Sequence, residues 1–276
     1  IPHSVEDGEI IVHGNESEKF AGLLNAEIRR PMHGGVLDAK EPGSLKVIRE
    51  LLSAALGQRD GRKVTFTVPA APLGAADALT YHEATLRQIL SDMGYEPSSI
   101  NEGLAVIYAE LEASNYTGIG ISCGGGLCNV CLAYLAVPVM SFSVPKAGDF
   151  IDQSAANVTG ERANRVRLAK EDSFHFNGFF ADKMHQVISV YYDDLIRSLV
   201  GGLRDGFAGT PNIPKFHRPI PLVLSGGTAL PPGFRDRFET VLQEQDFPIK
   251  VSEIRMAENP LYATAKGALV CALSDL

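Results

Sequence analysis

The stretch that decides the fold reads Thr117-Gly-Ile-Gly-Ile-Ser-Cys-Gly-Gly-Gly-Leu-Cys-Asn-Val-Cys-Leu-Ala-Tyr134. Two short apolar runs, 119–123 and 127–135, flank three consecutive glycines. Apolar runs joined by glycine predict a strand, a turn and a second strand. Three glycines exceed what a tight turn needs, and they leave backbone N–H groups open to an anion such as phosphate. The stretch fits both a phosphate-binding turn and a plain hairpin, and the rest of the chain must decide between them.

The bulk composition narrows the class of protein. The chain has 276 residues, 45% of them hydrophobic, which suits one large domain or two smaller ones. Its net charge of −8 argues against a nucleic-acid partner, which would call for a basic face. No apolar run approaches the ~20 residues of a membrane span and no signal peptide opens the sequence, so we expect a cytoplasmic location. The first residue is Ile1, so we expect a processed or trimmed piece.

The cysteines offer a different interpretation. Cys123, Cys128 and Cys131 have the C-x4-C-x2-C spacing of plant-type iron–sulfur ligation, and Cys271 follows far downstream. An iron–sulfur or zinc protein is therefore a remote alternative. Cys128 and Cys131, however, are an odd number of residues apart in a strand-like run, so they should point to opposite faces. We favour thiols buried as small hydrophobic side chains, and no metal ligand is predicted.

Strand and helix patterns alternate along the chain. Strands are expected at 9–12, 63–68, 119–123, 127–135, 137–144, 221–225 and 249–254. Helices are expected at 15–25, 44–56, 75–93, 101–111, 159–169, 183–203, 233–245 and 262–273, with caps at Ser44 and at Thr159. Loops are expected at 29–37, 145–152 and 206–218, with a further helix directly after the loop 145–152, and a short hairpin is expected at 173–178. On the apolar face of helix 75–93, His82 is predicted to be a packed core histidine rather than a ligand.

This alternation predicts an α/β protein with mixed sheets. Glycines follow a predicted strand twice, at 124–126 and at Gly226-Gly227. In open α/β sheets, ligands collect at the carboxyl ends of the strands. Two such turns predict a nucleotide held between two halves of the molecule.

A series of short motifs supports this interpretation. They are Arg30-Pro-Met-His-Gly-Gly-Val-Leu37, Val64-Thr-Phe-Thr-Val-Pro69, Asn101-Glu-Gly103, Ser122-Cys-Gly-Gly-Gly-Leu-Cys-Asn129, Gly148-Asp149, Gly160-Glu-Arg-Ala-Asn-Arg165, Leu224-Ser-Gly-Gly-Thr-Ala-Leu-Pro-Pro-Gly233 and Ala257-Glu-Asn-Pro260. In this order they resemble the actin-like ATPase superfamily of actin, the seventy-kilodalton heat-shock chaperones and bacterial MreB, and they are most similar to MreB-like cell-shape proteins. The resemblance runs along nearly the whole chain.

The resemblance implies an α/β, actin-like two-domain fold. Each half would be a mixed β-sheet flanked by helices, with a nucleotide cleft between the halves. Domain I would comprise residues 1–117 and 259–276, and domain II residues 118–258, with a smaller helical subdomain at 153–217. The family's first strand pair carries an Asp-x-Gly-Thr phosphate loop that this sequence lacks, so we expect that N-terminal hairpin to be missing.

The resemblance also implies roles for individual residues. Glu102 matches the glutamate that helps to position the hydrolytic water, and is the candidate catalytic residue. The implied cofactor is ATP with Mg²⁺. The candidate cofactor-binding residues are Ser122, Gly124, Gly125, Gly126, Leu127, Gly148, Asp149, Glu161, Asn164, Arg165, Gly226, Gly227 and Thr228.

Several of these positions depart from the family pattern. Ser122 replaces the aspartate that holds the metal through water, and a hydroxyl cannot offset the charge of Mg²⁺ as a carboxylate does. Leu127 and Cys128 replace two threonines of the phosphate turn. Thr228 replaces the third glycine of the adenosine motif, and Asn164 replaces a lysine.

We therefore expect an MreB-like scaffold with a degenerate nucleotide cleft, acting in cell shape or assembly. It would bind copies of itself, or other cytoplasmic or membrane-associated proteins, and reach the inner membrane surface only through them. The alternative is an active, filament-forming ATPase. The metal aspartate is absent while Glu102 is kept, so any ATPase activity is expected to be weak.

Overall fold

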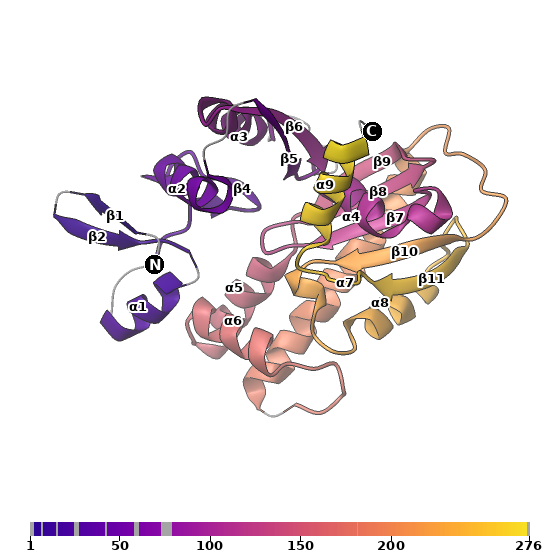
Figure 1. Ribbon diagram of the computed structural model, residues 1–276. Coiled ribbons are helices and arrows are strands. Elements are labelled where there is room, and N and C mark those ends of the chain that lie inside the picture. The colour runs from indigo at the N-terminus through magenta and orange to yellow at the C-terminus, as the bar shows by residue number, and fades with distance from the viewer. Residues whose placement is uncertain are drawn as a thin grey trace. The chain divides into compact units, whose positions relative to one another are not determined.

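The computed structural model (Figure 1) describes residues 3–6, 8–14, 16–24, 28–41, 43–57, 61–72, 79–180 and 182–274. The chain forms two compact units. The first comprises Ile1–Val64 and Tyr81–Pro97, and the second comprises Thr65–Thr80 and Ser98–Leu276. These units are defined by packing, and the division into domains after residue 117 stays a prediction.

The first unit combines small strand pairs with helices. β1 (His3–Glu6) pairs antiparallel with β2 (Glu9–Val12), and α1 (Glu16–Leu24) follows. The segment predicted as a loop at 29–37 contains a small antiparallel pair, β3 (Met32–His33) and β4 (Val36–Leu37). α2 (Ser44–Leu56) begins after Gly43, which holds the capping position that was predicted for Ser44, and ends at Gly57 as predicted. α3 (Thr80–Asp92) completes the unit, and residues 75–78 of its predicted start lie outside the described residues.

His82 on α3 is a packed core histidine, as predicted. Its side chain is buried, and its Nδ1 accepts a hydrogen bond from the backbone N–H of Leu37 at 3.1 Å. Burial lowers the pKa of the ring, against the smaller opposing effect of Glu83. The lowered pKa and the accepting Nδ1 both suit a neutral imidazole that holds α3 beside β4.

Two strands lead from one unit to the other. β5 (Arg62–Val68) pairs with β6 (Tyr95–Asn101), and the Thr65 and Ser98 hydroxyls share a hydrogen bond of 2.7 Å. The sequence did not predict β6, because its polar residues and Pro97 are unlike an ordinary strand.

The second unit is built on a five-stranded sheet. The strand order is β11-β10-β7-β8-β9, formed by β7 (Gly118–Cys123), β8 (Cys128–Tyr134), β9 (Val137–Val144), β10 (Ile220–Ser225) and β11 (Val251–Met256). β7, β10 and β11 are parallel, while β8 and β9 continue the sheet antiparallel to their neighbours. The mixed sheet was predicted, and it brings the ends of β7 and β10 side by side.

Helices cover both faces of this sheet (Figure 1). One face packs on α5 (Gly148–Thr159), α6 (Ala163–Asp172), α7 (Lys183–Gly209) and α8 (Phe234–Gln243) through a large hydrophobic core. The other packs on α4 (Glu102–Glu110) and α9 (Ala263–Ser274) through a second core. β7 is buried along its whole length because Ile119 and Ile121 face the first core, while Gly120 lies under α4.

The cysteines divide between these two cores. Cys123 and Cys128 are free cysteines that lie opposite each other in the β7–β8 register, in the first core. Cys131 lies in the second core, and Cys271 packs against that core. The opposite orientation predicted for Cys128 and Cys131 is confirmed. Within the described part of the chain, no group of three His, Cys, Asp or Glu side chains could hold a metal ion. The iron–sulfur or zinc alternative is therefore wrong, because the sheet separates its ligands.

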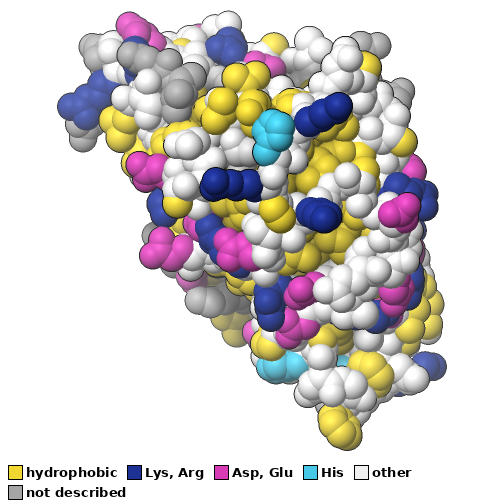
Figure 2. Space-filling model, turned by 90° about the vertical axis from the view of Figure 1, so that its right-hand side faces the viewer, with side chains coloured by type: hydrophobic (Ala, Val, Ile, Leu, Met, Phe, Trp, Pro, Cys, Tyr) yellow, Lys and Arg dark blue, Asp and Glu magenta, His cyan; other side chains and the backbone are white. Residues whose placement is uncertain are grey.

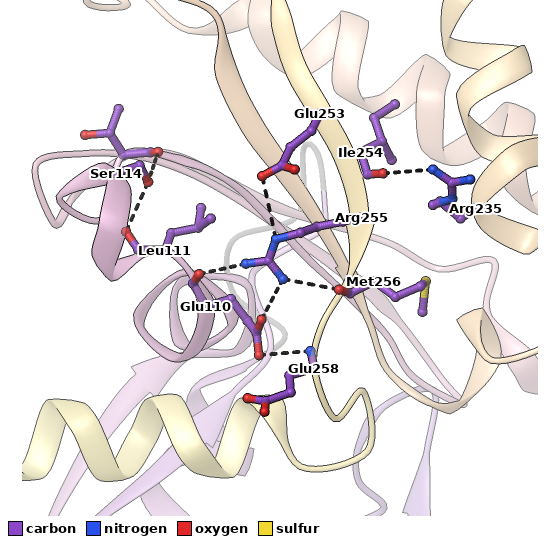
Figure 3. A network of polar contacts seen from close by, with 10 residues as sticks. Glu110, Leu111, Ser114, Arg235, Glu253, Ile254, Arg255, Met256 and Glu258 are labelled. Carbon is purple, nitrogen blue, oxygen red and sulfur yellow. Dashed lines mark hydrogen bonds and ion pairs between the residues drawn. The ribbon is translucent and has the colours of Figure 1, made fainter.

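A polar network ties α4 to the edge of the sheet (Figure 3). Arg255 on β11 donates to the buried Glu110 carboxylate at 2.7 Å, and also to the backbone carbonyl of Glu110 at 2.7 Å. The second carboxylate oxygen of Glu110 accepts the backbone N–H of Glu258 at 3.2 Å. The guanidinium fork and one carboxylate thus fix α4, β11 and the turn before α9 together.

Some predicted boundaries are wrong. α5 begins at Gly148, inside the predicted loop 145–152, and Thr159 ends α5 rather than capping α6, which starts at Ala163 after Arg162. The described residues of segment 173–178 form no hairpin. α7 continues to Gly209, well past the predicted end at residue 203, since the ring of Phe142 lies close against Gly202 and Gly206.

Among the described residues, no helix combines the length and the apolar character that crossing a membrane requires.

Candidate functional site

The two glycine turns meet at one edge of the sheet. β7 and β10 are parallel neighbours with Ser122 opposite Ser225, so the turns that follow them emerge side by side. The Thr228 hydroxyl in the second turn donates to the Gly124 carbonyl in the first at 2.7 Å. Gly226 has φ 92°, and a Cβ there would overlap the backbone of Cys123. Only glycine allows the turns to come this close.

In the first turn, the carbonyl groups accept hydrogen bonds from neighbouring backbone, whereas two N–H groups are left without a partner among the described residues. The Gly124 N–H donates to the Leu127 carbonyl at 2.9 Å, which closes the turn. The first N–H groups of α5, at Gly148 and Asp149, donate to the carbonyls of Gly124 and Gly125 at 3.2 and 2.8 Å. Among the described residues, the N–H groups of Gly125 and Gly126 have no hydrogen-bond partner. They are donors that a bound anion could use.

A carboxylate borders this turn. A Cβ on Gly125 would lie 3.6 Å from Asp149 Oδ1, so the side chain of Asp149 lies against the turn. A Cβ on Gly148 would lie 2.7 Å from the Thr228 hydroxyl and 3.3 Å from Lys170 Nζ. Gly148 therefore lets both turns and a buried lysine converge on the start of α5.

The sequence did not single out this lysine or its partner. Lys170 on α6 is buried, with Nζ 2.6 Å from Asp152 Oδ1 and donating to the Gly148 carbonyl at 3.2 Å. Burial raises the pKa of Asp152 to about 6, although the charge of Lys170 opposes the shift. The one available signal was the spacing of Lys170 one turn after Val166, on the buried face of α6.

Glu102 lies at the start of α4, where the Asn101 side chain caps the helix by accepting the N–H groups of Gly103 and Leu104. Its Oε2 accepts hydrogen bonds from Ser122 Oγ and Asn129 Nδ2, both at 3.0 Å. Burial raises the pKa of Glu102, and the two hydrogen bonds oppose the shift. Glu102 thus lies beside the β7–β8 pair that the glycine turn connects, and its role as the catalytic residue stays a prediction.

Asn129 is the residue that links this group to the rest of the unit. It pairs with Ser122 across β7 and β8, and its Oδ1 accepts the backbone N–H of Ala70 at 2.8 Å. The sequence placed Asn129 in a motif but not in the site. Its role became visible only when the strand register set it beside Glu102.

The other predicted residues lie apart from this hydrogen-bonded group. Glu161 and Arg165 form an ion pair of 2.9 Å around the start of α6, where Arg165 and Asn164 are exposed. Among the described residues, no hydrogen bond joins any of these three to the glycine turns. Leu127 is buried, and Gly227 lies near the side chain of Leu261. Their roles in binding a nucleotide stay predictions.

The donor set fits a phosphate better than a metal. The bare N–H groups of Gly125 and Gly126 suit phosphate oxygens. Mg²⁺ favours carboxylate oxygens, and the Ser122 hydroxyl is instead directed at Glu102.

Comparison with solved structures shows the fold. A MamK double helical filament matches with a TM-score of 0.73 and 18% identity, over 93% of this chain and 84% of that chain. MreB5 of Spiroplasma citri bound to AMPPNP matches with a TM-score of 0.71 and 14% identity, over 98% and 86%. The ethanolamine utilization protein EutJ of Carboxydothermus hydrogenoformans matches with a TM-score of 0.58 and 17% identity, over 87% of this chain and 77% of that chain.

A search of curated protein sequences gave no match. The structural matches establish an actin-like fold of the MreB-like kind, as the motif order implied. The Volactin family model matches residues 1–272, which is nearly the whole chain. The chain therefore belongs to the Volactin family.

Proposed function

We propose that this chain is a nucleotide-binding, actin-like scaffold that assembles with copies of itself, works through protein partners, and hydrolyses ATP weakly or not at all. The observation that carries the proposal is the pair of glycine turns joined by the Thr228–Gly124 hydrogen bond, with unpaired N–H groups at Gly125 and Gly126 among the described residues.

The structural neighbours support binding and assembly. The MreB5 structure contains AMPPNP, and the MamK structure is a double helical filament. In our proposal the N–H groups of Gly125 and Gly126 donate to the phosphates, and Glu161 and Arg165 border the adenosine. Acting in cell shape or assembly, through cytoplasmic or membrane-associated partners, belongs to the same proposal.

The residue at position 122 supports weak hydrolysis. ATP, when bound, supplies a γ-phosphate that water can attack. Glu102 Oε2 already accepts two hydrogen bonds, one of them from the Ser122 hydroxyl, so a water oriented for attack would use the other carboxylate oxygen, Oε1. Ser122 also adds no negative charge to hold a metal ion beside the phosphates.

Calorimetry tests the binding. AMPPNP and ADP should each give heat that fits a single site. Gly125→Val should weaken the affinity at least tenfold, because its side chain would cover the bare N–H groups. Gly201→Ala on α7 is the matched control, since a Cβ there meets nothing within 4 Å. Absence of heat with either nucleotide, with and without Mg²⁺, would disprove the proposed binding.

One observation favours the alternative, an active ATPase. Glu102 is a half-buried carboxylate with a raised pKa near the glycine turn, which is a common state of a general base. Phosphate release separates the two functions. Turnover that Glu102→Gln abolishes while AMPPNP affinity is unchanged would establish the ATPase, whereas turnover at background level in both proteins supports the scaffold.

A further inference from the structure

Three polar side chains around the loop before α7 are joined by hydrogen bonds. Ser173 directly follows α6, Asp182 directly precedes α7, and His185 lies in the first turn of α7. The Nε2 atom of His185 is 2.9 Å from the Ser173 hydroxyl oxygen, and its Nδ1 atom is 2.8 Å from Asp182 Oδ1. No local sequence pattern marks this group, because the loop must fold back before Ser173 and His185 meet.

The hydrogen bonds assign the protons in this group. The backbone N–H of His185, and then its ring, hold the pKa of the Asp182 carboxyl group below its ordinary value. A carboxylate only accepts hydrogen bonds, so in the neutral ring the Nδ1 atom carries the proton and the Nε2 atom carries a free electron pair. That electron pair faces the Ser173 hydroxyl, which is the arrangement of a base that takes the proton of a serine.

The imidazole of His185 is held in this orientation by its neighbours. Its side chain is only 12% exposed, and its ring stacks on that of Phe174, with centroids 6.4 Å apart and an angle of 14° between the planes. Asp182 Oδ1 also accepts the backbone N–H of His185 at 2.9 Å, so one carboxylate fixes both the ring and the start of α7. Phe174 is itself buried and stacks on Tyr192. The base is therefore positioned before any substrate arrives.

The Ser173 hydroxyl is accessible and faces two acceptors. Ser173 is exposed, and its hydroxyl lies 3.0 Å from the carbonyl oxygen of Ala169 and 2.9 Å from Nε2 of His185. A hydroxyl carries one proton, and rotation about its C–O bond directs that proton to either acceptor. When the proton points at Nε2, the serine oxygen is a nucleophile paired with its base.

The loop that this group closes carries exposed aromatic rings. Because Ser173 and Asp182 both bond to His185, the loop between them begins and ends at the same imidazole. Within it, Phe179 is 84% exposed and Phe180 is 42% exposed. The loop forms the lower end of the second unit in Figure 1, and Figure 2 shows hydrophobic and histidine side chains at that end. Large exposed rings beside a nucleophile favour a substrate with an apolar group.

The geometry points to a second activity, in which Ser173 takes the acyl group from esters with an apolar acyl chain, with His185 as base and Asp182 as positioning residue. Ser173 Oγ forms a bond to the ester carbonyl carbon while His185 Nε2 takes the hydroxyl proton. The bond from that carbon to the alcohol oxygen breaks, and His185 returns the proton to the leaving alcohol. Water then releases the acyl group as a carboxylic acid. The three residues lie outside the candidate nucleotide site, so this activity is independent of the proposed function.

Mass spectrometry of the full chain tests the nucleophile. Incubation with p-nitrophenyl butyrate, or with a fluorophosphonate that reacts with activated serines, should add one group per chain, on the peptide that contains Ser173. Ser173→Ala should take up neither group. His185→Gln should react roughly a hundredfold more slowly, because a general base contributes at least about that factor. The release of p-nitrophenolate measures the rate in the same samples.

Asp182→Asn tests the positioning residue. Asparagine still caps the first turn of α7, but its amide no longer holds the proton of His185 on Nδ1. For p-nitrophenyl butyrate, kcat should therefore fall at least about tenfold while KM stays the same, because the orientation of the base matters only as the proton moves. An unchanged kcat would overturn this role and leave Asp182 as a helix cap alone.

Ser141→Ala and His217→Gln are the matched controls. Ser141 is an exposed serine whose hydroxyl donates to a backbone carbonyl at 3.4 Å, and His217 is an exposed histidine in the connection to β10. Both should react as the unmodified chain does, and thermal melting monitored by circular dichroism checks that every variant is folded. The inference is overturned if the unmodified chain takes up neither reagent, if the group is found on another residue, or if folded Ser173→Ala is labelled as the unmodified chain is.

Discussion

The hydroxyl of Ser122 donates a hydrogen bond to the carboxylate of Glu102. An aspartate at position 122 would instead place a second negative charge there and repel Glu102. The same strand register that sets Ser122 beside Glu102 also delivers Asn129, so two donors offset part of the cost of burying one carboxylate. The chemistry of the site therefore depends on a pair of neutral side chains.

Restoring the family's aspartate should destabilise the protein. Ser122→Asp puts two carboxylates within hydrogen-bonding distance, and their repulsion should cost about 1–3 kcal/mol of unfolding free energy at pH 7. The loss should be smaller at pH 5 than at pH 7, because burial already raises the pKa of Glu102 and the carboxylate therefore takes up a proton more readily as the pH falls. Urea unfolding at both pH values measures the loss, with Ser122→Asn as the uncharged control. Equal stability of the two variants at pH 7 would contradict the repulsion.

Asp152 should make stability depend on pH. Its pKa is raised to about 6 in the folded protein, so the folded state binds a proton that the unfolded chain has released. The free energy of unfolding should fall as pH rises from about 4 to 6, by up to about 3 kcal/mol at 1.36 kcal/mol per pKa unit, and then level off. In Asp152→Asn this part of the slope should vanish. Urea unfolding in steps of pH measures both slopes, and parallel curves would refute the prediction.

At the scale of elements, α4 and α9 approach each other closely in the second unit. A Cβ on Gly267 of α9 would overlap the carbonyl oxygen of Ala105 on α4. One on Gly103 would lie 2.6 Å from the backbone nitrogen of Cys131. Because Gly267 and Gly103 carry no side chain, α4 can lie between α9 and the sheet, with Glu102 at its start.

Gly267→Ala should therefore push these two helices apart and lower the free energy of unfolding by about 2–3 kcal/mol, which is in the range measured for overpacked cores. Gly201→Ala, at an open position on α7, should instead stabilise the chain by about 0.5–1 kcal/mol. Denaturant unfolding compares the two. If they shift stability in the same direction, the packing explanation fails.

The elements that sequence predicted well are those specified by local pattern. β7, β10 and their glycine turns are short apolar runs with glycine after them, and both the mixed sheet and the meeting of the turns followed. The predicted end of α7 was wrong because Gly202 and Gly206 lie against the ring of Phe142, a contact with a residue some sixty positions earlier that no local pattern reveals. Lys170 with Asp152, and Asn129 with Glu102, were missed for the same reason. Each pair needs the topology before its partners meet.

At the scale of the whole molecule, the hydrophobic cores are unequally distributed. Both large cores of the described residues belong to the second unit. The first unit buries fewer side chains, among them Leu37, Ile89 and Leu90. Local stability follows buried apolar contact, so the units should open at different free energies.

Hydrogen exchange in rising urea should reveal this difference. Amides of β7, β8 and β10 should exchange only through global unfolding, whereas amides of α2 and α3 should exchange through an opening that costs less. Mass spectrometry of peptides from each element measures both. A single common free energy of exchange for all of them would show that the two units unfold as one.

The separation of the thiols into two cores has a practical use. Cys123, Cys128 and Cys131 have no exposed surface, and burial raises the pKa of Cys131 to about 12, so its reactive thiolate is scarce at neutral pH. Cys271 is only half-buried on α9. Replacing Cys271 with serine should leave a native fold that is inert to maleimide dyes. A cysteine introduced at exposed Val190 would then carry a single fluorophore.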